Sequence, residues 1–121
     1  MSRRDTGQRG ENLAAGFLKE RGYQILETNY RCPHGEIDIV AQHNDCLVFI
    51  EVRSKKSRNF GSPEESITPA KKEHLIDSAW HYQQARGNLP QMWRIDFVAV
   101  ELNYANEVKR IELFENAVGE D

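Results

Sequence analysis

Two short segments rich in Ile and Val, separated by a polar turn, constrain the fold of this chain more than any other feature. Residues 36–41 and 47–53 are typical of β-strands, and the five residues between them are polar and turn-like. A two-residue turn at Asn44-Asp45 would place His43 opposite Cys46 and join the strands as an antiparallel hairpin. This hairpin predicts the centre of a β-sheet.

The alternation of side chains sorts the hairpin residues onto two faces. One face carries the facing pairs Val40–Phe49, Asp38–Glu51 and Glu36–Arg53. The other face carries the residues expected in the core: Ile37, Ile39, Val48, Ile50 and Val52. Because Val40 and Phe49 are apolar, we expect another element to cover their end of the charged face.

Helical periodicity and capping residues predict the remaining elements. Gly22 is placed to end a first helix, and Thr68-Pro69 supplies an N-cap and a first-turn proline for a second. The expected helices cover 6–21 and 68–87, and the further strands cover 23–31, 93–100 and 109–114. The order α-β-β-β-α-β-β predicts one α/β or α+β domain over 1–121, with a mixed sheet flanked by helices.

Composition narrows the class of protein. The 121 residues suit a single domain, and 29% of them are charged, with a net charge of −3. We find neither an apolar run of membrane-spanning length nor an apolar signal segment. The two cysteines cannot build a disulfide framework, so we expect reduced thiols and a cytoplasmic location.

Cations gather in one part of this acidic chain. Residues 53–72 contain only two acids, Glu64 and Glu65, but six cations: Arg53, Lys55, Lys56, Arg58, Lys71 and Lys72. Residues 54–66 have no periodicity and predict a mobile basic loop, whereas 116–121 form an acidic tail. The basic segment is either a solvated loop or a surface that guides a polyanion to one site.

The facing carboxylates of Asp38 and Glu51 need compensation. Their Cβ atoms would lie roughly 4.5–5.5 Å apart, where like charges destabilise a sheet. Three compensations are open: the Arg53 guanidinium, protonation of one acid, or a divalent cation such as Mg²⁺. The alternative is an ordinary charged stripe in which Glu36 pairs with Arg53.

Asp38, followed after twelve residues by Glu51-Val52-Arg53, is similar to the D-x(n)-E-x-K signature of the PD-(D/E)xK nuclease superfamily. More closely, the chain resembles the YraN family of small bacterial endonuclease-like proteins. The matching segments run from residue 7 to about 100: Gly7-Gln8-Arg9-Gly10-Glu11, Ala14-Ala15, Gly22-Tyr23, Asn29-Tyr30-Arg31, Gly35-Glu36-Ile37-Asp38, Val48-Phe49-Ile50-Glu51-Val52-Arg53, Phe60-Gly61, Lys71 and Arg94-Ile95-Asp96-Phe97.

This resemblance implies a restriction-endonuclease-like core in which Asp38 and Glu51 hold Mg²⁺ or Mn²⁺ and Glu11 joins them from the first helix. From the residues alone, Glu11 can equally be a residue near the helix start that the helix dipole favours. Arg53 stands where the superfamily has lysine. A guanidinium can bind phosphate but stays protonated, so it cannot act as a neutral base, and Lys55 is a possible substitute.

Three functions follow from these residues. The first is a metal-dependent nuclease for DNA or structured nucleic acid, with Glu11, Asp38, Glu51 and Arg53 as its catalytic set. The second is a nucleic-acid-binding module without turnover, and the third is an interaction domain that uses the acidic tail. In the first two, phosphate contacts would come from the cations Lys55, Lys56, Arg58, Lys71 and Lys72. A monomer and a dimer are both compatible with the sequence.

Overall fold

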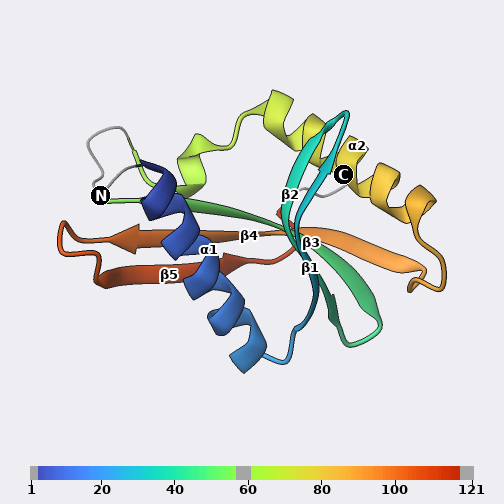
Figure 1. Cartoon of the computed structure of the whole chain (residues 1–121), viewed down its shortest axis with the longest axis horizontal. Helices are drawn as coiled ribbons and strands as arrows, with labels where there is room; N and C mark the ends of the chain where they lie inside the picture. Colours follow the sequence, from blue (N-terminus) through green and yellow to red (C-terminus); the bar gives the residue numbers. More distant parts are fainter. Residues whose placement is uncertain (1–2, 57–60, 118–121) are drawn as a thin grey trace.

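A computed structural model of the protein describes residues 3–56 and 61–117 (Figure 1). Each expected element is present, with bounds shifted by a few residues. The elements are α1 (Arg3–Glu20), β1 (Gln24–Cys32), β2 (Gly35–His43), β3 (Cys46–Lys55), the short 3₁₀ helix η1 (Glu64–Ser66), α2 (Pro69–Ala85), β4 (Met92–Leu102) and β5 (Val108–Phe114). In the part of the chain described here, neither α-helix is long and apolar enough to cross a membrane.

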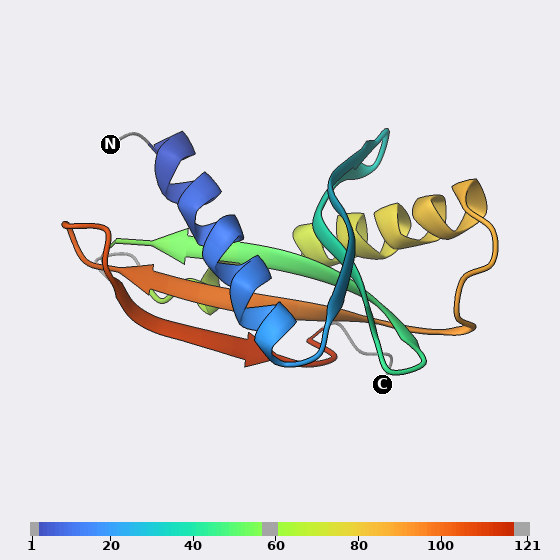
Figure 2. The same cartoon turned by 60° about the horizontal axis from the view of Figure 1, so that its bottom comes forward.

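The five strands form one mixed sheet in the order β1-β2-β3-β4-β5. Neighbouring strands are antiparallel except β3 and β4, which are parallel and are joined through α2. Figure 2 shows α1 lying across one side of the sheet, while α2 lies on the other side beside the β1–β2 arm. The predicted mixed sheet with flanking helices is therefore confirmed.

Each helix closes its own apolar core. The α1 core contains Ala14, Leu18, Tyr23, Ile39, Ala41, Val48, Ile50, Val52, Val98, Val100 and Leu102. The α2 core contains Tyr30, Ile37, Val40, Leu47, Phe49, Leu75, Ala79, Tyr82 and Ile95. The expected cover over Val40 and Phe49 is thus α2, and the central strands are buried on both faces.

The hairpin has the predicted register near its turn. His43 pairs with Cys46 and Val40 with Phe49, and the ladder runs as far as Ile39 and Ile50. Asn44 adopts the left-handed backbone that a tight hairpin turn requires, with φ 55°.

Ile37 is fully buried as predicted, but the predicted face was wrong, because this residue lies in the α2 core rather than beside Ile39. Beyond Ile39, the structure pairs β2 with β1, so that Ile37 lies opposite Tyr30. A register shift interrupts β1 between Ile25 and Glu27, opposite Ala41 and Val40 of β2.

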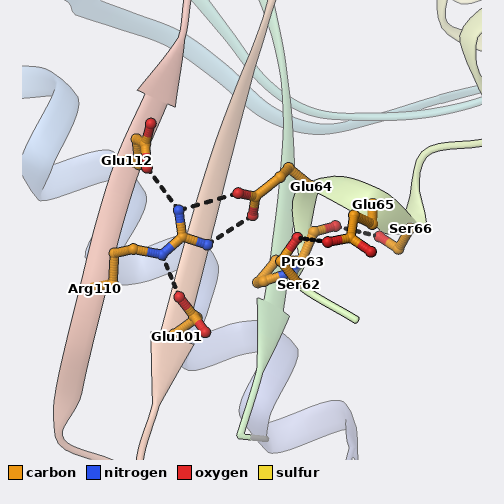
Figure 3. A network of polar contacts seen from close by, with 8 residues as sticks. All are labelled: Ser62, Pro63, Glu64, Glu65, Ser66, Glu101, Arg110 and Glu112. Atoms are coloured by element: carbon orange, nitrogen blue, oxygen red, sulfur yellow. Dashed lines mark hydrogen bonds and ion pairs between the residues drawn. The ribbon is translucent and has the colours of Figure 1, made fainter. Parts of the chain in front are cut away.

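Of the loop expected over 54–66, residues 57–60 lie outside the described residues, and the described parts contain the end of β3 and η1. The strand β3 continues through Lys55. Arg110 on β5 connects η1 to β4 and β5, because its guanidinium contacts Glu64, Glu101 and Glu112 (Figure 3). Thr68 then caps α2, accepting a hydrogen bond from the backbone N–H of Lys71 at 3.1 Å. These contacts fix the position of the first turn of α2.

The Arg94-Ile95-Asp96-Phe97 segment has a structural role. Asp96 is fully buried, and its carboxylate accepts hydrogen bonds from Tyr23 Oη at 2.8 Å, Arg94 Nε at 2.9 Å and the Asn116 N–H at 2.9 Å. Because every partner is a donor, the buried charge is compensated. Residues 118–121 of the predicted acidic tail lie outside the described residues.

Candidate functional site

The candidate site lies where β2 separates from β3. Pairing between these strands ends at Ile39 and Ile50, and the β1–β2 arm then rises away from the sheet between the two helices (Figures 1 and 2). Asp38 and Glu51 are the next residues along each strand. In place of a further ladder bond, the Val52 N–H donates to Asp38 Oδ2 at 2.8 Å. At this junction, side chains from both helices approach the carboxylate pair.

Two cations form ion pairs with Glu51. Glu51 is only 2% exposed, and its Oε2 lies 3.1 Å from Arg53 Nη2 and 3.2 Å from Lys71 Nζ. Arg53 is its neighbour on β3, whereas Lys71 comes from the first turn of α2. Two side chains from different elements thus form ion pairs with one oxygen of an almost fully buried carboxylate.

The pKa of Asp38 is strongly raised by its surroundings. Burial, the charge of Glu51 and a hydrogen bond between the two carboxyls raise the pKa of Asp38 to about 8. The pair therefore retains a proton at neutral pH in the absence of a further cation. Two of the three compensations considered from the sequence, Arg53 and protonation, act together here.

The predicted Glu36–Arg53 pair was wrong. Glu36 lies opposite Arg31 on β1, with 3.9 Å between Arg31 Nε and Glu36 Oε2, while Arg53 contacts Glu51. The cause is the same separation of the strands that moved Ile37 to the other core. Arg53 Nε is buried and has no hydrogen-bond partner among the described residues.

Glu11 reaches the site because α1 packs closely against β3. A Cβ added at Gly10 would lie 1.6 Å from Ser54 Oγ, so only glycine permits this approach. With its amide oriented to donate, Asn29 Nδ2 lies 2.9 Å from both Glu11 Oε1 and Glu36 Oε1. Burial, followed by the charges of Glu36 and Glu51, raises the pKa of Glu11.

An open pocket of about 450 Å³ adjoins this carboxylate. Its lining consists of Gly7, Gln8, Glu11, Asn29, Arg31 and Glu36, all from the start of α1 and the β1–β2 arm. The carboxylates that line the pocket are those of Glu11 and Glu36, and its walls also carry two amides and one guanidinium. A ligand reaching the site from this side would meet hydrogen-bonding groups.

The donors at the junction fit a hard divalent cation through two carboxylates. Mg²⁺ is commonly held by one or two carboxylates, with water and substrate phosphate as the other ligands. Asp38 and Glu51 supply that pair. Within residues 3–56 and 61–117, no three His, Cys, Asp or Glu side chains are grouped closely enough to hold a metal ion. Glu11 as a third ligand stays a prediction.

Comparison with known proteins agrees with the motifs. The model of the uncharacterised protein family UPF0102 matches residues 10–100. A UPF0102 protein of Dehalococcoides mccartyi is 50% identical over 99% of this chain and 98% of its own length. UPF0102 proteins of Moorella thermoacetica and Caldicellulosiruptor saccharolyticus are 46% and 43% identical, each over 97% of this chain and at least 98% of their own.

The chain belongs to the UPF0102 family. The resemblance to endonuclease-like proteins of the YraN type is thus confirmed at the level of the family. In this UPF0102 protein, the resemblance covers the elements that build the site, from Gly10 on α1 to the end of β4.

Of the predicted phosphate-binding cations, the structure brings Lys71 to the carboxylates of this UPF0102 protein. Lys55 and Lys56 end β3 and begin the following bend, and Lys72 is exposed on α2. Arg58 lies outside the described residues. The contact of Lys71 with Glu51 and those of Asn29 with Glu11 and Glu36 were not predicted from the sequence, although Lys71 and Asn29 belong to the matching family segments.

Proposed function

We propose that this UPF0102 protein is a metal-dependent nuclease that hydrolyses phosphodiester bonds in DNA or structured nucleic acid. The observation that carries the proposal is the buried Asp38–Glu51 pair at an open strand junction, bordered by Arg53 and Lys71. Unlike an ordinary charged stripe, this pair combines the raised pKa of Asp38 with two cations that converge on Glu51.

The residues of the site suit phosphoryl chemistry. A Mg²⁺ or Mn²⁺ ion held by Asp38 and Glu51 would polarise the scissile phosphate and lower the pKa of a bound water. Asp38 has to release its proton to act as a ligand, so low pH should oppose activity. The partly exposed Arg53 guanidinium would contact a phosphate oxygen, where it stabilises developing negative charge.

The surrounding cations support a nucleic-acid substrate. Lys55 and Lys56 follow Arg53 along the chain, and Lys71 and Lys72 begin α2. Contacts between lysines and phosphates position a backbone without reading its bases. We therefore expect a preference for nucleic-acid structure rather than for sequence.

The test is cleavage of several substrates by purified protein with Mn²⁺ or with EDTA. The panel contains linear duplex, single-stranded, nicked and branched DNA, and a structured RNA. The wild type should cleave at least one of them only with the metal, and Glu51→Gln and Asp38→Asn should not. Glu73→Gln, on the exposed part of α2, is the matched control and should cleave normally. Absence of metal-dependent cleavage on the whole panel would refute the nuclease.

A nucleic-acid-binding module without turnover is the second candidate. It is favoured by Arg53, because this guanidinium stands where the superfamily has a lysine and stays protonated. This alternative predicts salt-sensitive binding to nucleic acid, with no metal-dependent product from any substrate.

A further inference from the structure

The ion pair between Lys71 and Glu51 joins a lysine ammonium to a carboxylate that is proposed to bind the metal. Glu51 is almost fully buried, whereas the Lys71 side chain is 29% exposed, so its ammonium bridges the carboxylate and the solvent. Arg53 contacts the same oxygen, Oε2. A divalent cation approaching Glu51 would meet two positive charges already paired with that oxygen.

The backbone of Lys71 is fixed although its side chain can change partners. Thr68 caps the helix at the Lys71 N–H, and the Arg110 contacts to η1 hold the preceding segment against β4 and β5 (Figure 3). Lysine carries its charge on a flexible four-carbon stem. Lys71 can therefore exchange Glu51 for another anion without movement of α2.

We infer that Lys71 blocks Glu51 until a nucleic-acid phosphate draws it away, so that metal and nucleic acid bind this site with positive coupling. This inference rests on the proposed function, since it takes Glu51 as a metal ligand and a phosphodiester as the substrate. It assigns Lys71 a regulatory role in metal binding in addition to contact with the nucleic acid.

The coupling follows from competition for one carboxylate. Without nucleic acid, the metal must bind against the Lys71 charge and break its ion pair with Glu51. With nucleic acid bound, Lys71 is paired with phosphate, and the metal meets one positive charge at Glu51 Oε2, that of Arg53, instead of two. By linkage, bound metal must strengthen nucleic-acid binding by the same factor. Couplings of this kind typically change affinity by about 5- to 150-fold.

The experiment measures Mn²⁺ affinity by calorimetry, with and without a short DNA duplex whose phosphorothioate linkages slow hydrolysis. Lys71→Gln should bind Mn²⁺ on the order of tenfold more tightly than the wild type without DNA, and DNA should then add little. Lys71→Arg keeps the charge and should retain the weak DNA-free affinity. Lys19→Gln removes the same charge from the exposed last turn of α1, where no role in the site is assigned, and should keep the wild-type coupling.

Two outcomes would overturn the inference, and they separate it from the proposed function. If Glu51→Gln abolishes Mn²⁺ binding but Lys71→Gln leaves the DNA-free affinity unchanged or weaker, the metal site stands and the role of Lys71 is refuted. If Glu51→Gln binds Mn²⁺ as the wild type does, the proposed function fails together with the inference. Thermal melting in EDTA shows that each variant is folded, so that an affinity change can be assigned to the site.

Discussion

Asp38→Asn should stabilise the metal-free protein, and the gain should grow with pH. The pKa of Asp38 rises from its usual 3.8 to about 8 in the folded chain, because of burial and of the neighbouring Glu51. The folded state thus binds this proton more tightly than the unfolded state. The resulting stabilisation is complete below the unfolded pKa and is lost as pH rises through the folded pKa.

The size of the effect follows from the two pKa values. One pKa unit corresponds to about 1.36 kcal/mol. Integrated between pH 5 and pH 9, a shift from 3.8 to about 8 lowers the free energy of unfolding by about 4 kcal/mol. Asparagine cannot ionise, and its side-chain oxygen can still accept the Val52 N–H. The stability difference between Asp38→Asn and the wild type should therefore widen by about 4 kcal/mol over this range.

Urea denaturation in EDTA at pH 5, 7 and 9 measures this difference directly. Asp45→Asn is the matched control, because Asp45 is exposed in the hairpin turn and the same charge is removed there. The control should follow the pH dependence of the wild type. Parallel stability curves for Asp38→Asn and the wild type would show that the Asp38 carboxyl is not the buried, charge-crowded group described above.

Three further predictions concern the support of the site and its surface. Gly10→Ala should lower the melting temperature by the equivalent of about 1–3 kcal/mol and weaken cleavage, because the added Cβ would overlap Ser54. The control Gly16→Ala should do neither, because its added Cβ would have no neighbouring atom within 4 Å. Arg110→Gln should lower the urea midpoint by the equivalent of roughly 3–5 kcal/mol, because it leaves the buried Glu101 without this partner. Reversing the charge of Lys55 and Lys56 should weaken duplex binding for all sequences and flatten its salt dependence by about 0.9 per lost contact; unchanged titrations would exclude these lysines.

The features that the sequence predicted correctly depend on local rules. Turn length and side-chain alternation fix the hairpin register near Asn44-Asp45, and Thr68-Pro69 marks the start of α2. The meeting of Asp38 and Glu51 follows from that register, since they are the first residues beyond the last paired position. This much needs no knowledge of the other elements.

The features that were missed depend on contacts between distant elements. Ile37 and Glu36 were misplaced because β2 separates from β3 beyond Ile39 while it stays paired with β1, and the alternation in β2 does not reveal this loss of one partner. Lys71 was assigned to the nucleic-acid surface, since its distance from Glu51 is set by the path of the chain through η1 and by Arg110 on β5. Charge patterning along one segment cannot supply that information.

The most direct measurement of the central claim is single-turnover cleavage by wild type and Glu51→Gln as Mn²⁺ is restored to EDTA-treated protein, with DNA affinity measured on the same samples. The wild type should gain cleavage in proportion to bound metal, while Glu51→Gln should bind DNA and remain inactive. Equal cleavage by the two proteins, or none by the wild type at saturating Mn²⁺ and DNA, would contradict the assignment of the Asp38–Glu51 pair as a nuclease centre.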